Sequence, residues 1–160
     1  MALLLVRHAD ALSRGEWDGD DIDRQLSGKG HRQAAALVAV LAEFEPARLL
    51  SSPYLRCLET LAPLADHLRS PVEPDGRLGE GAGRAAVELV GSLRHDRVVL
   101  CSHGDVIPDV LAAVATEDEV ELGPHPRVEK ASVWVLEADG GRFTSATYLP
   151  PPGRGGPVAR

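Results

Sequence analysis

Two histidines and two arginines stand just beyond short apolar runs in this chain. Arg7 and His8 follow the run LLLV, Arg56 comes a few residues after ARLLS, and His103 directly follows RVVLCS. Guanidinium groups pair bidentately with phosphate oxygens, whereas they would repel a divalent cation. A neutral imidazole can attack phosphorus, and a second imidazole can help the arginines to hold the negative charge of the transferred group. If these four side chains meet, they favour phosphoryl transfer.

Two other interpretations of the same residues find less support. A serine hydrolase could use Ser102 and His103, but the G-x-S-x-G nucleophile elbow is missing. A metal site is not indicated either, because the sequence has neither H-x-x-x-H nor C-x-x-C spacing. We therefore expect no metal and no other cofactor. The dipeptide Arg94-His95 in a polar stretch shows that an Arg-His pair alone says little.

The elements that must position these residues follow an alternating pattern. The candidate strands are ALLLV, ARLLS, RVVLCS and SVWVLEA, and helical patterns separate the first three from one another. Ser27 is a suitable N-cap for a helix through LSGKGHRQAAALVAVLAEF, whose Leu37, Val38, Leu41 and Phe44 fall on one face. This alternation is typical of an α/β sheet with crossover helices.

Further helical patterns complete this layout. One begins near Pro53 and is expected to be kinked or split by Pro63, and two others cover RAAVELVGSL and VIPDVLAAVA. The segment ASVWVLEADGGRFTSATYLP predicts a hairpin that turns at 139–141. In open α/β sheets, ligands bind beyond the carboxyl ends of the strands, where the loops converge. The histidines and arginines should therefore meet at one edge of the sheet.

Length and composition restrict the classes of protein. The chain has 160 residues, which suits one domain, and its net charge of -7 argues against a nucleic acid polymer or an anionic membrane as the main partner. Two cysteines are too few for a disulfide scaffold. Neither a charged leader nor an apolar run of about 18 residues is visible. We therefore expect a cytoplasmic protein.

Four segments, LLLVRHAD, LSGKGHRQA, SSPYLRCLET and VVLCSHGDVI, resemble in this order the histidine phosphatase superfamily, also called the phosphoglycerate mutase-like family. The resemblance implies a three-layer α/β/α sandwich with a mostly parallel central sheet. It also implies a phosphatase domain over residues 1–150, and residues 151–160 are expected to be a disordered tail. The compact size resembles the SixA-like phosphohistidine phosphatases. The segments RHAD and VIPDVL also resemble the phosphatase domain fused to Nudix domains in some mycobacterial nucleotide hydrolases.

The resemblance assigns a role to each residue that matches a family motif. It makes His8 the phosphorylated nucleophile, Arg7 and Arg56 phosphate ligands, and His103 the second histidine of the pocket. The usual R-H-G reads Arg7-His8-Ala9 here, which adds one methyl group beside the phosphate.

The general acid of the family corresponds to a region where RLGEG offers Glu80. Glu73, Glu88 and Asp105 are alternatives for this acid. Among these four carboxylates, Glu80 is the expected acid.

Other residues invite functional interpretations, but simpler ones are preferred. The remaining histidines lie in polar contexts and are expected on the surface: His31, His67, His95 and His125. Cys57 and Cys101 are expected in the core. Three cations could rim the pocket, although solvated positions are the simpler expectation: Arg14, Arg24 and Lys29. Trp17 lies in the acidic 13–25 loop and could cover the pocket.

The expected substrate is a phosphorylated small molecule, a nucleotide or a phosphohistidine protein. The expected reaction is hydrolysis of a phosphomonoester or a phosphohistidine through an intermediate on His8. A nucleotide phosphatase of the Nudix-fused kind is one alternative. A catalytically silent phosphate-binding module is another, since binding alone needs only the arginines. The sequence leaves the oligomeric state open.

Overall fold

A computed structural model of the chain describes residues 1–153 and contains one mixed sheet within them. Its strand order is β3-β2-β4-β1-β5-β6, and the first four of these neighbours are parallel. The strands span Ala2–Arg7 (β1), Arg48–Ser51 (β2), Val72–Pro74 (β3), Val98–Ser102 (β4), Val133–Asp139 (β5) and Arg142–Leu149 (β6). β5 runs antiparallel to both β1 and β6. The prediction of a mostly parallel sheet is confirmed.

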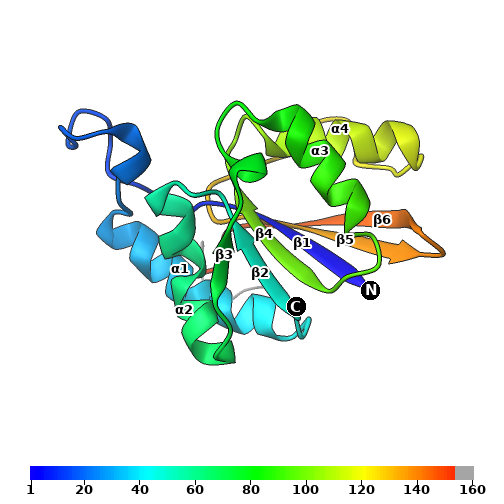
Figure 1. The fold of residues 1–160 in the computed structure, drawn as a ribbon, viewed down its shortest axis with the longest axis horizontal. Helices are drawn as coiled ribbons and strands as arrows, with labels where there is room; N and C mark the ends of the chain where they lie inside the picture. Colours follow the sequence, from blue (N-terminus) through cyan, green and yellow to red (C-terminus); the bar gives the residue numbers. More distant parts are fainter. Residues whose placement is uncertain (154–160) are drawn as a thin grey trace.

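Helices cover both faces of this sheet (Figure 1). They span Gly28–Ala42 (α1), Leu55–Leu68 (α2), Gly83–Ser92 (α3) and Ile107–Glu117 (α4), with short 3-10 helices at Asp21–Asp23 (η1) and Gly76–Leu78 (η2). Side chains alternate along β1, so Leu4 and Val6 pack with α1 and α2, whereas Leu3 and Leu5 pack with α3 and α4. These two buried clusters are the cores of a three-layer α/β/α sandwich, as expected.

The helices follow their sequence signals closely. The Ser27 hydroxyl caps α1 by accepting a hydrogen bond from the Gly30 N–H at 3.0 Å, and Leu37 and Leu41 are buried as predicted. Phe44 lies beyond the end of α1. Pro63 was expected to kink or split α2; a split is wrong, because α2 continues from Leu55 to Leu68 with Pro63 inside it.

One strand escaped prediction. β3 has three residues and lies at the edge of the sheet, where Val72 pairs with Leu49 and Pro74 closes the strand. Such a short segment ending in proline carries no period-2 signal, and proline is tolerated only because the strand is at an edge. β3 matters for the site because the chain leaves it directly toward η2 and Glu80.

The carboxyl-terminal part forms the predicted hairpin of β5 and β6. Gly140 and Gly141 occupy the turn with φ of 62° and 83°, values that favour glycine. The first residue of the expected tail, Pro151, is buried after the hairpin, and residues 154–160 lie outside the described residues. None of the helices within residues 1–153 combines the length and apolarity needed to span a bilayer.

Candidate active site

The strand register brings the two predicted site histidines together. β1 and β4 are paired so that Arg7 lies opposite Ser102, and His8 and His103 follow at adjacent positions. The His8 N–H donates to the Ser102 carbonyl oxygen at 3.1 Å, and the two imidazole centroids are 5.5 Å apart in an edge arrangement. All five predicted site residues line one cavity of about 600 Å³: Arg7, His8, Arg56, Glu80 and His103.

His8 is held by its own backbone. Its Nδ1 lies 2.8 Å from the Ala9 carbonyl oxygen, and the residue is only 6 % exposed. Burial lowers the pKa of His8 to about 3, and the positive charges of Arg56 and Arg7 and the nearby His103 add to this effect. His8 is therefore neutral at physiological pH.

The Ala9 position is fixed by contacts with α2. Its N–H donates to the Thr60 hydroxyl at 2.9 Å, and that hydroxyl donates to the Arg56 carbonyl oxygen at 2.6 Å. Ala9 is fully buried, so the extra methyl group is accommodated in the core rather than in the cavity. The chain after His8 is thus tied to the helix that carries Arg56.

His103 is held through its other ring nitrogen. Its Nε2 lies 2.8 Å from the Ser52 hydroxyl and 3.6 Å from the Cys57 sulfur. The Ser52 oxygen already accepts the Tyr54 N–H at 3.1 Å, so its own proton is available to Nε2. This favours the tautomer with a proton on Nδ1. Among residues 1–153 the buried Nδ1 has no hydrogen-bond partner, and the Glu80 Oε2 is 3.8 Å from it.

Arg56 lies in the first turn of α2 and is fully buried. Its Nη2 contacts the Glu80 Oε2 at 2.6 Å and the Asp21 Oδ2 at 3.2 Å, and its Nη1 donates to the Asp21 carbonyl oxygen at 2.9 Å. The guanidinium carbon also lies 4.9 Å from the centroid of the Tyr54 ring. Two carboxylates of the chain thus share one terminal nitrogen of this arginine, Nη2.

Asp21 comes from the 13–25 loop, and no specific signal in the sequence indicated it as a site residue. Arg24 and Arg14 also contact its carboxylate, at 2.9 and 3.2 Å. Burial opposes ionisation of Asp21, but the hydrogen bonds and charges of Arg24 and Arg56 outweigh it and lower its pKa. Arg24 is buried, whereas a solvated position was the simpler expectation. Arg14 and Arg24 both line the cavity.

Arg7 is positioned by the loop before β5 and by Gly104. Its Nη1 donates to the Val128 carbonyl oxygen at 2.7 Å. A methyl group on Gly104 would lie 2.8 Å from the guanidinium carbon of Arg7, which is closer than van der Waals contact allows. The glycine after His103 therefore makes room for the arginine before His8.

The four carboxylates considered for the general acid separate clearly in space. Glu80 and Asp105 line the cavity, and the Asp105 carboxylate accepts the Gly81 N–H at 2.8 Å. Glu73 instead pairs with Arg48 on the edge of the sheet at 2.9 Å, and Glu88 is exposed on α3. The geometry thus leaves Glu80 and Asp105 as the candidates for the general acid.

The remaining candidate residues lie where simpler interpretations expected them. Four histidines are exposed, and neither cysteine is: His31, His67, His95, His125, Cys57 and Cys101. The sequence did not indicate that Cys57 would touch His103. Trp17 donates from its indole nitrogen to the Asp20 carbonyl oxygen at 2.8 Å and does not line the cavity. Within residues 1–153, histidine, cysteine and acidic side chains form no group of three suited to a metal ion.

Lys130 lines this cavity and Ser52 binds His103, and both were missed as site residues. Ser52 had a usable signal, since it is the polar residue that directly follows β2 at the same sheet edge. Lys130 had none, because it lies in the long irregular segment between α4 and β5.

The fold and the paired histidines are those of a phosphoglycerate mutase-like α/β protein. The family model described as histidine phosphatase superfamily (branch 1) matches residues 3–86, and the chain belongs to this family. The structure of the protein histidine phosphatase SixA complexed with tungstate has a TM-score of 0.73 and 20% sequence identity, covering 93% of this chain and 94% of that one. This likeness shows the shared fold.

Two characterised relatives are similar in sequence. An 8-oxo-(d)GTP phosphatase of Mycolicibacterium smegmatis is 33% identical over 94% of this chain and 48% of its own length. A glucosyl-3-phosphoglycerate phosphatase of Mycolicibacterium vanbaalenii is 35% identical over 49% of this chain and 35% of its own length. The chain thus spans about half the length of the first relative and about a third of the second.

Proposed function

We propose that this chain is a phosphatase that hydrolyses a phosphorylated small molecule through a phosphohistidine on His8. The observation that carries the proposal is the contact between His8 Nδ1 and the Ala9 carbonyl oxygen. A carbonyl can only accept, so the ring proton lies on Nδ1 and the neutral ring keeps its lone pair on Nε2. Among residues 1–153, Nε2 has no hydrogen-bond partner, and His8 lines the cavity.

In the first step, His8 Nε2 forms a bond to phosphorus while the bond to the leaving oxygen breaks. Arg7 and Arg56 bind the equatorial phosphoryl oxygens, and His103 donates a hydrogen bond from its Nδ1–H to one of them. In the second step, a water molecule attacks phosphorus, the nitrogen-phosphorus bond breaks, and inorganic phosphate leaves. No redox change occurs, and the His8 lone pair is restored.

Glu80 is the proposed proton donor to the leaving oxygen, and its carboxylate then accepts a proton from the attacking water. Its carboxylate contacts Arg56 at 2.6 Å and lines the cavity, so it lies close to the proposed position of the transferred group. Asp105 is the second candidate because it lines the same cavity and bonds the backbone of the residue after Glu80. A phosphate that binds Arg56 displaces Glu80 from it and frees the carboxyl group for this exchange.

The sequence similarity to an 8-oxo-(d)GTP phosphatase supports a nucleotide as one candidate substrate. A phosphohistidine protein is the second candidate, supported by the short connection between β3 and α3 at residues 75–82, which adds no inserted segment above the cavity. The two unpaired, buried cysteines accord with the proposed cytoplasmic location. Metal ions and other cofactors have no part in the proposed steps.

The test is to trap the intermediate. Wild-type protein that is quenched during turnover of p-nitrophenyl phosphate, a nucleotide or a phosphohistidine protein should carry acid-labile, base-stable phosphate on His8. The His8→Gln variant should carry none and should not turn over. Turnover that survives in His8→Gln would overturn the mechanism. Phosphate binding without turnover or label in the wild type would identify a silent binding module.

A further inference from the structure

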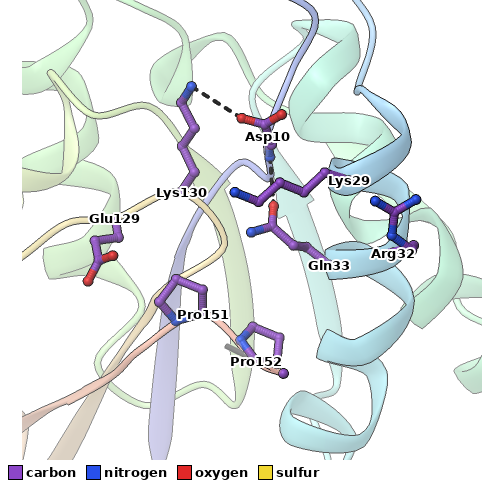
Figure 2. A pocket seen from close by; sticks show the side chains of 9 residues that line it. Asp10, Lys29, Arg32, Gln33, Glu129, Lys130, Pro151 and Pro152 are labelled. Atoms are coloured by element: carbon purple, nitrogen blue, oxygen red, sulfur yellow. Dashed lines mark hydrogen bonds and ion pairs between the residues drawn. The ribbon is translucent and has the colours of Figure 1, made fainter. Parts of the chain in front are cut away.

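A second cavity of about 480 Å³ lies beside the first, and Lys130 lines both of them. One wall is α1, the opposite wall is the loop before β5, and Pro151 and Pro152 close the lower end (Figure 2). Asp10, two residues after His8, lies at the top of this space and contacts the Lys130 ammonium group at 3.6 Å. The Asp10–Lys130 ion pair therefore marks the boundary between the two cavities.

Three side chains with nitrogen donors line this second cavity: Lys29, Gln33 and Lys130. Figure 2 shows Lys29 and Gln33 extending from α1 toward the loop that carries Lys130. The Gln33 Oε1 accepts the Asp10 N–H at 2.9 Å, which fixes the orientation of the amide. The amide nitrogen of Gln33 is then a donor that faces the cavity beside the two ammonium groups.

The two carboxylates that line this cavity both have ion-pair partners. Asp10 pairs with Lys130 and accepts the Ser27 hydroxyl at 2.6 Å, while Glu129 contacts Arg127 at 2.6 Å. Both carboxylates that line the cavity are thus neutralised by the chain.

The two cations on α1 differ from these carboxylates in their ion pairing. Lys29 and Arg32 line the cavity, and neither forms an ion pair with any residue in the described part of the chain. Donors and unpaired positive charge in a chain of net charge -7 suit an anionic group.

We propose that this second cavity binds a second anionic group, a phosphate or a carboxylate, on the leaving part of the substrate. The inference rests on the proposed function and narrows its substrate class to small molecules with two separate anionic groups. The transferred phosphoryl group lies at His8, and the rest of the molecule passes the Asp10–Lys130 pair. Lys29 and Gln33 then bind the distal anion, and Arg32 adds positive charge at the rim of the same cavity (Figure 2).

Binding to the His8→Gln variant tests this inference without turnover. Two matched pairs of probes separate the two anion types: adenosine 5'-monophosphate against adenosine 3',5'-bisphosphate, and glycerol 3-phosphate against 3-phosphoglycerate. The quantity of interest is the gain in affinity that the second anionic group gives within each pair. Adding Lys29→Gln and Arg32→Gln should reduce this gain about tenfold for the anion that the cavity accepts.

Arg69→Gln in the same background is the control. Arg69 is an exposed cation at the far end of α2, roughly 20 Å along the helix from Arg56. This control should leave the gain unchanged. The inference is overturned if neither second anion improves binding, or if Lys29→Gln with Arg32→Gln lowers the gain no more than Arg69→Gln does. Trapping of phosphate on wild-type His8 reports separately on the proposed function, so the two failures are distinguishable.

Discussion

The ends of β1 and β4 carry the same residue type at neighbouring positions, yet the two sites hold opposite ring nitrogens. His8 is bound at Nδ1 by the Ala9 carbonyl oxygen, whereas His103 is bound at Nε2 by the Ser52 hydroxyl. The first arrangement leaves a bare lone pair, and the second favours a proton on the free nitrogen. Strand register decides that two imidazoles meet, but the partner of one nitrogen decides what each imidazole can do.

The largest expected effect tests this division of roles. His103→Gln removes one donor to the phosphoryl oxygens and should lower kcat by on the order of a hundredfold or more. Phosphate should still be trapped on His8 in this variant, although more slowly, whereas His8→Gln should give no label at all. Rapid-quench labelling with mapping of the modified residue measures both. Label on His103 in the wild type would reverse the assignment.

A smaller effect is expected from Ser52, which is a positioning residue because it acts through His103. Ser52→Ala removes the hydrogen bond that favours one tautomer and should lower kcat about tenfold. Nitrogen-15 NMR should show a changed tautomer ratio for His103. Ser51→Ala is the matched control, since the Ser51 hydroxyl is also buried but donates to the Ser52 carbonyl oxygen. Unchanged His103 resonances in Ser52→Ala would contradict this role.

The smallest expected effect is on the pH dependence of the free energy of unfolding, because His8 is buried and neutral. Its pKa is about 3 in the folded protein, whereas an imidazole in an unfolded chain titrates near 6.5. As pH falls below 6.5 the unfolded chain takes up this proton first, so the folded state loses stability toward pH 3. From pH 6.5 to 5.5 the wild type should lose about 1 kcal/mol more than His8→Gln.

Urea unfolding of both proteins at the two pH values measures this difference. His31→Gln, a change at an exposed histidine, should follow the wild type. Identical pH dependence of wild type and His8→Gln would show that His8 is protonated equally in the folded and unfolded states.

The sequence predicted those parts of the fold whose signals are local. The apolar runs of β1 and β4 are buried strands, and the polar residues at their ends mark the edge where the cavity forms. β3 was missed because three residues with a terminal proline carry no periodicity. The site residues on strand and helix ends were therefore easier to find than those on irregular segments.

Asp21 and Lys130 illustrate what could not be predicted. Each lies in a segment whose path is set by tertiary contacts, such as the contact of Asp21 with Arg56 across 35 positions of the chain. No spacing rule links residues that are brought together in this way. The choice of ring nitrogen also depends on hydrogen-bond geometry, which residue type and spacing do not encode.

The contact between Arg56 and the carboxylates of Asp21 and Glu80 has a consequence for affinity and release. In the proposed reaction, a phosphate that binds Arg56 must displace the carboxylates of Asp21 and Glu80, which already pair with it. The measured affinity is then a difference between two ion pairs, so a dianion competes better than a monoanion of the same shape. In the proposed reaction the same exchange runs in reverse when inorganic phosphate leaves, because Asp21 and Glu80 pair with Arg56 again. We therefore expect product inhibition to be weak.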